Sequence, residues 1–72
     1  MTDKSIQYFQ MLVDNDFKPT NVNVYNRFAK YDEVNKTSII IHLQNDGSWR
    51  CYNETGAEFA NGSSAWELEA QL

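Results

Sequence analysis

Apolar and polar residues follow different periods along the chain, and the first period is that of a helix. Between residues 2 and 17 the apolar side chains fall on one broad face at helical spacing, with polar side chains largely opposite. This apolar face is formed by Ile6, Phe9, Leu12, Val13 and Phe17, with Tyr8 at its edge. Pro19 disfavours a helical backbone at Lys18, which predicts that the helix ends by about Phe17.

The next segment, residues 20–31, fits both a strand and a helix. Its β-branched and aromatic residues are types that strands favour. A helical spacing is matched by Val24, Tyr25, Phe28 and Tyr31. Because the polar turn at 32–37 leads into a clear strand, we favour a hairpin whose first strand covers roughly residues 23–31.

The strand at 38–44 is followed by Asn-Asp-Gly at positions 45–47, a strong hairpin signal. A two-residue turn would pair Leu43 with Arg50. A three-residue loop with a left-handed Gly47 would pair Leu43 with Trp49 instead. The second register separates the apolar residues more cleanly, so we favour it. It places on one face Ile39, Ile41, Leu43, Trp49 and Cys51, and on the other Ile40, His42, Arg50 and Tyr52.

The end of the chain contains a second turn and a helix signal. The turn at 54–56 again ends in glycine, and a short fourth strand at 57–60 stays open. Ser64 and Glu67 have the spacing of a capping box, which predicts a helix after Ser64, with a strand as the alternative. The expected fold is therefore one α+β domain over residues 1–72. It has a small antiparallel β-meander of three strands, or four, with an N-terminal and a C-terminal helix packed on one face.

Charge and composition limit the classes of function. The formal net charge is −4, so this is a small acidic protein. That charge disfavours non-specific association with nucleic acid or with anionic lipid, although residues 18–50 are mildly basic. The single cysteine and the lack of an apolar N-terminal segment are typical of a cytoplasmic protein, and no run is long enough to span a membrane.

The sequence shows no constellation typical of an enzyme, a metal site or a cofactor site. His42 and Cys51 are a conceivable base and nucleophile, but the favoured register places them on opposite faces of the hairpin. A structural zinc site needs four ligands, and His42 and Cys51 are the only histidine and cysteine in the chain. We therefore expect no catalytic residues, no bound metal and no cofactor.

A surface role is the favoured hypothesis. We expect a non-enzymatic protein–protein interaction module, most plausibly a small inhibitor or adaptor of bacterial, phage or mobile-element type. It would occupy a surface of a partner protein, for example a host nuclease or a defence complex. The candidate contact residues are Arg50, Tyr52, Trp66 and Glu67.

Two alternatives accompany this hypothesis. Aromatic and basic residues on an exposed sheet face can stack and hold nucleotides, which makes nucleic-acid binding the second candidate function. Its residues would be Tyr25, Arg27, Lys30, Tyr31, Arg50 and Tyr52. Homodimerisation through the sheet edges or through Trp66 is the other alternative.

Overall fold

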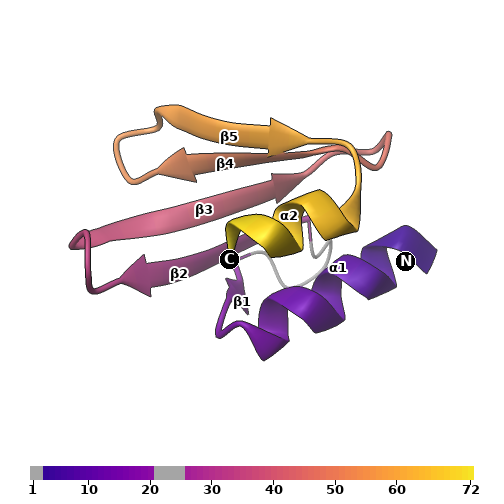
Figure 1. The fold of residues 1–72 in the computed structure, drawn as a ribbon, viewed down its shortest axis with the longest axis horizontal. Helices are drawn as coiled ribbons and strands as arrows, with labels where there is room; N and C mark the ends of the chain where they lie inside the picture. Colours follow the sequence, from indigo (N-terminus) through magenta and orange to yellow (C-terminus); the bar gives the residue numbers. More distant parts are fainter. Residues whose placement is uncertain (1–2, 21–25) are drawn as a thin grey trace.

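A computed structural model describes residues 3–20 and 26–72, which form two helices and one antiparallel sheet (Figure 1). The helices are α1 (Asp3–Asp14) and α2 (Ala65–Gln71). The strands are β1 (Lys18–Pro19), β2 (Arg27–Asp32), β3 (Thr37–Leu43), β4 (Trp49–Asn53) and β5 (Glu58–Gly62). The spatial order β1-β2-β3-β4-β5 is that of a meander, so the predicted α+β meander is confirmed. It has five strands rather than three or four.

Helix α1 ends at Asp14, within the limit that Pro19 predicts, because Asp16 adopts a left-handed backbone with φ of 69°. The amide of Asp16 donates to the carbonyl of Val13 at 3.1 Å, and the amide of Phe17 donates to that of Leu12 at 2.9 Å. These two bonds close the helix in a Schellman motif. The chain then turns Phe17 into the core and continues as β1, a strand that no sequence pattern indicated.

Strand β2 confirms the strand interpretation over the part of the segment that the structure describes. It starts at Arg27, and the earlier predicted strand residues at 23–25 lie outside the described residues. The Asp32 carboxylate closes the β2–β3 turn by accepting hydrogen bonds from the side chain and amide of Asn35 and from the amide of Val34. These bonds, that of the Asn35 side chain first, lower the pKa of Asp32.

The loop between β3 and β4 confirms the three-residue interpretation. Leu43 lies opposite Trp49 in the register. The amide of Gly47 donates to Gln44 at 3.0 Å, and Gly47 has a φ of 91°, which glycine adopts without the steric cost of a side chain. The β4–β5 turn repeats this arrangement, with the amide of Gly56 bonded to Asn53.

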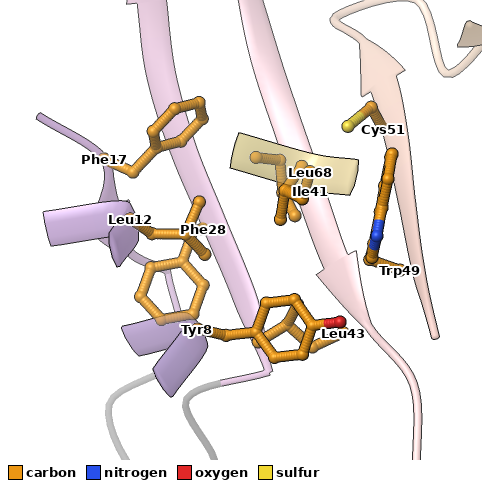
Figure 2. Packing of buried hydrophobic residues seen from close by; sticks show 9 residues of the cluster. All are labelled: Tyr8, Leu12, Phe17, Phe28, Ile41, Leu43, Trp49, Cys51 and Leu68. Atoms are coloured by element: carbon orange, nitrogen blue, oxygen red, sulfur yellow. The ribbon is translucent and has the colours of Figure 1, made fainter. Parts of the chain in front are cut away.

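The core lies between the helices and one face of the sheet. Figure 2 shows side chains of both helices and of β2, β3 and β4 gathered in a single cluster. Its buried members are Tyr8, Leu12, Phe17, Phe28, Ile41, Leu43, Trp49, Cys51 and Leu68. The indole N–H of Trp49 donates to the carbonyl of Ser64 at 2.9 Å, which holds the start of α2 against β4.

Helix α2 begins where the capping-box spacing predicts, but the capping bonds differ. The Ser64 side chain makes no hydrogen bond to a backbone amide of the helix. Its hydroxyl instead donates to the Glu67 carboxylate at 2.6 Å. The spacing of Ser64 and Glu67 therefore identified the start of the helix, although the pair contacts through its side chains.

A candidate interaction surface on the outer face of the sheet

The face of the sheet that points away from the core forms the first candidate site. Because successive side chains of a strand point to opposite faces, the residues that alternate with the core residues project outward. We call this surface the outer face. Its residues in β2, β3 and β4, with two of β5, are Arg27, Ala29, Tyr31, Ser38, Ile40, His42, Arg50, Tyr52, Glu58 and Asn61.

Three basic side chains lie in one row across the outer face. Arg27 pairs with His42, and His42 pairs with Arg50, so the three occupy directly opposed positions on β2, β3 and β4. Adjacent strands are about 4.8 Å apart, which brings all three within reach of one partner group. Like charges directly opposite one another destabilise a sheet, and in this row His42 lies between the two arginines.

The row is only partly neutralised by acidic neighbours. Arg50 and Glu58 form an ion pair with a separation of 3.4 Å, and the Arg50 side chain remains 50% exposed. An exposed pair of this kind contributes about 0.2–1 kcal/mol, so a partner carboxylate can replace Glu58 at little cost. No other ion pair is present among the side chains that the structure describes. The outer face is therefore able to bind an anionic group.

An apolar and aromatic row runs beside the basic row. Ala29 pairs with Ile40, and Ile40 pairs with Tyr52, which places the three side by side on β2, β3 and β4. They are half-buried by their neighbours, whereas Tyr31 at the end of β2 is 56% exposed. Tyrosine and arginine are the residue types that dominate binding energy at protein interfaces. The outer face thus combines apolar contact area with charge.

The structure brings together some of the sequence-predicted site residues and separates others. Arg50, Tyr52, Arg27 and Tyr31 share the outer face. Lys30 does not, because it pairs with Ile39 on the core side, where its Nζ lies 5.6 Å from the centre of the Phe17 ring. Tyr25 lies outside the described residues.

Trp66 and Glu67 belong to a different surface. Both are in α2, whose Leu68 packs into the core on the opposite side of the sheet from the outer face (Figures 1 and 2). The Glu67 carboxylate accepts a hydrogen bond from the hydroxyl of Ser64, and Trp66 is 74% exposed. The four candidate contact residues therefore form two separate pairs, Arg50 with Tyr52 and Trp66 with Glu67.

His42 and Cys51 are separated as the favoured register predicts. His42 lies on the outer face, and the Cys51 side chain is 2% exposed in the core. Burial, with a smaller effect of the Glu58 carboxylate, raises the pKa of the Cys51 thiol from 9.0 to about 11. The thiol is therefore protonated near neutral pH and faces away from His42.

The raised pKa of Cys51 predicts a loss of stability in alkali. Between about pH 9 and pH 11 the unfolded chain loses its thiol proton while the folded chain keeps it. The stability that the protonated Cys51 thiol contributes is fully present below about pH 9. It is lost as the pH rises toward 11, and the loss is no more than about 2–3 kcal/mol.

Urea unfolding at about pH 8 and about pH 10.5 measures this difference. Tyr8 also has a raised pKa because of its burial, so it adds a change of the same sign. The variant Cys51→Ala isolates the thiol, because it should show a smaller fall in stability than the wild type over the same interval. An equal fall in both proteins would exclude Cys51 as the cause.

The sheet edges are unlike one another. β1 is a two-residue edge strand that contains Pro19, which has no amide to offer a further strand. β5 forms the other edge, with a bulge opposite Cys51 and Tyr52 and with Phe59 56% exposed. A bulge hinders edge-to-edge pairing. Both edges carry a feature that hinders pairing, and homodimerisation through an edge or through Trp66 stays a prediction.

Among the described residues, no three His, Cys, Asp or Glu side chains lie close enough to hold a metal ion. No helix in the described part of the chain has the length and apolar character needed to cross a membrane. Comparison of the chain with family models, with curated proteins and with solved structures finds no significant match.

Proposed function

We propose that this protein is a non-enzymatic protein–protein interaction module whose outer face binds an acidic surface of a partner protein. The observation that carries the proposal is the row of Arg27, His42 and Arg50 beside Ile40 and Tyr52, on a face that neither helix covers (Figure 1). Arginine binds carboxylates through paired hydrogen bonds, and the aromatic row supplies contact area.

The distribution of charge over the whole chain supports an oriented encounter. The chain carries −4 in total, yet the outer face presents two arginines against the single carboxylate of Glu58. The net charge of −4 repels an acidic partner at long range, whereas at close range the field of that partner turns the basic outer face toward it. Complementary charge at the outer face therefore favours one orientation of binding and disfavours partners of the wrong sign.

Within this class we favour a small inhibitor or adaptor that acts by occupying a surface. A domain of 72 residues can present a rigid face of the size needed for a transient complex without a catalytic cleft. A partner such as a host nuclease or a defence complex, in a bacterial, phage or mobile-element setting, is the narrower form of this hypothesis.

The test is to remove the outer-face contacts while keeping the fold. Wild-type protein serves as bait in a lysate of the source cells, and the captured partner is identified by mass spectrometry. Arg50→Ala and Tyr52→Ala should each abolish this capture. Both side chains lie outside the core, so the thermal midpoint should stay nearly unchanged. Equal loss of fold and capture would contradict a dedicated outer-face site.

The matched control is Trp66→Ala, an exposed aromatic on the opposite side of the sheet. It should leave capture through the outer face intact. If Tyr52→Ala removes no captured partner and Trp66→Ala removes them all, the outer face is not the binding surface. A reverse-charge substitution in the identified partner, acidic to basic, should restore binding to an Arg50→Glu variant.

Nucleic-acid binding is the second candidate, and the shared position of Tyr31, Tyr52, Arg27 and Arg50 on one face favours it. Fluorescence anisotropy with labelled single-stranded DNA and RNA, at about 20 mM and about 200 mM salt, separates it from protein binding. Binding that weakens steeply with salt and is lost in Arg50→Ala would support it. Absence of binding at the lower salt concentration would remove it.

A further inference from the structure

The two helices enclose a groove on the side of the molecule opposite the outer face. The groove has a volume of about 980 Å³ and runs between the exposed side of α1 and the start of α2. Its floor and walls include Tyr8 and Met11 of α1 and Ala65 of α2, and Trp66 lies at its border with 74% of its surface exposed. This site is independent of the outer face and of the function proposed for it.

Among the residues whose side chains the structure describes, the charged ones that line the groove are acidic. They are Asp14 of α1 and Glu69 of α2. Asp14 accepts a hydrogen bond from the neutral amide of Gln10 at 3.0 Å. Neither carboxylate forms an ion pair with a side chain that the structure describes. A cationic group entering the groove would therefore meet two carboxylates that have no counter-ion among the described side chains.

The C-terminal end of α1 increases this preference for a cation. Asp14 is the last residue of α1, and it lines the groove together with Asn15. The C-terminal end of a helix carries a partial negative charge, which lysine or arginine in the last turn would offset, and α1 has no basic residue there. Helix α2 contributes its first residues and Glu69 to the groove, so its C-terminal end adds nothing to this preference.

We propose that this groove binds a basic amphipathic segment of a partner protein, with apolar side chains against Met11 and Trp66 and with lysine or arginine side chains at Asp14 and Glu69. Two roughly parallel helices with an open groove accept a third helix in the way that helix-in-groove complexes do. Tryptophan is the residue type most enriched among the dominant contacts of protein interfaces. The charge of the groove selects basic segments over acidic ones.

A designed helical peptide tests the proposal directly. The probe is an acetylated peptide of about 14 residues, or about 21 Å of helix, with leucine on one face and lysine at its flanks. Titration calorimetry should show saturable binding with one peptide per chain. Trp66 is exposed while Trp49 is 1% exposed, so a shift of tryptophan emission to shorter wavelength would report on Trp66. The same peptide with glutamate in place of each lysine should not bind.

Variants of the protein locate the peptide. Asp14→Asn with Glu69→Gln keeps the size of both exposed side chains and should weaken binding by about tenfold or more. Trp66→Phe should abolish the emission change, and Trp66→Ala should weaken binding. Arg50→Ala on the outer face should bind the peptide as the wild type does. Circular dichroism confirms that each variant is folded.

Three results would overturn this inference. They are absence of binding by the lysine peptide, equal binding of the lysine and glutamate peptides, and unchanged affinity in the Asp14→Asn, Glu69→Gln protein. None of these bears on the outer face, whose test uses other variants and another partner. Failure of the groove and failure of the proposed function are therefore distinguishable.

Discussion

Replacement of Gly62 by alanine is expected to destabilise the protein by about 3 kcal/mol, because β5 has no space for a side chain there. A Cβ at this position would lie 2.6 Å from Cζ2 and 2.8 Å from Cε2 of Trp49. It would also lie 3.0 Å from Oε2 of Glu67. Trp49 is 1% exposed and its indole is bonded to Ser64, so the ring cannot move without displacing the start of α2.

Urea unfolding followed by circular dichroism measures this cost, and Trp49→Phe provides the rescue. A phenylalanine ring lacks the fused part of the indole that meets the new Cβ. Gly62→Ala should therefore cost less in the Trp49→Phe background, with a coupling of about 1 kcal/mol or more. Purely additive effects would show that the close approach to Trp49 is not the cause.

Gly56→Ala is the matched control for the same chemical change. Gly56 has a φ of +90° and nothing within 4 Å of an added Cβ. The cost there comes only from the left-handed backbone, about 1–2 kcal/mol, and Trp49→Phe should not alter it. A difference between the two glycines in their dependence on Trp49 would separate steric crowding from backbone strain.

The sequence predicted the parts of the fold where several local signals agree. At the β3–β4 loop, the turn residues and the apolar alternation both favour the register that pairs Leu43 with Trp49. At α2, the spacing of Ser64 and Glu67 coincides with the start of a helical run. In both places the local signals require the same arrangement of the chain, so no contact with a distant segment is needed to predict it.

The parts that sequence reasoning missed depend on contacts between distant segments. The helix α1 stops through a left-handed Asp16, a residue type that tolerates this conformation but does not require it. Strand β1 exists because Lys18 and Pro19 lie beside Ala29 and Phe28 of β2, which no local pattern encodes. Because segment 20–31 fits both a strand and a helix, the sequence did not determine on which face of the sheet Lys30 lies.

The candidate sites divide in the same way. Arg50, Tyr52 and His42 could be assigned to one face from the register of a single hairpin. The addition of Arg27 in the same row required the β2–β3 register as well. The groove between α1 and α2 needs the full tertiary structure, because its two walls are about 50 residues apart in the chain. The sequence alone does not show that Trp66 and Arg50 lie on opposite sides of the sheet, because this depends on which face of the sheet the helices cover.

Two surfaces of opposite charge on opposite sides of one small domain suit an adaptor better than a simple blocker. A blocker needs only one face, whereas the outer face and the acidic groove could be occupied at the same time without steric conflict. If both proposals hold, a partner bound at Arg50 and a basic segment bound at Asp14 would be joined through the sheet. Joining two partners in this way raises the effective concentration of each at the other.

Replacement of Phe28 by alanine is expected to abolish cooperative folding. Phe28 is fully buried in β2, opposite Ile41 of β3 and beside Pro19 of β1. Its ring packs edge to face against that of Phe9, with the two ring centroids 5.8 Å apart. Loss of a buried phenylalanine costs about 3–5 kcal/mol. A single core in a domain of this size supplies about 3–5 kcal/mol in total, so the variant should lack a sigmoidal thermal or urea transition.

A smaller substitution and an exposed neighbour keep this expectation testable. Phe28→Leu removes less volume, so it should retain a cooperative transition with a lowered midpoint. Tyr31→Ala changes an aromatic of the same strand that is 56% exposed, and it should alter the free energy of unfolding by about 0.5 kcal/mol or less. If Tyr31→Ala unfolds the protein while Phe28→Ala does not, the assignment of the two faces of β2 is inverted. The outer face would then be the core, and Arg27 would not be available to a partner.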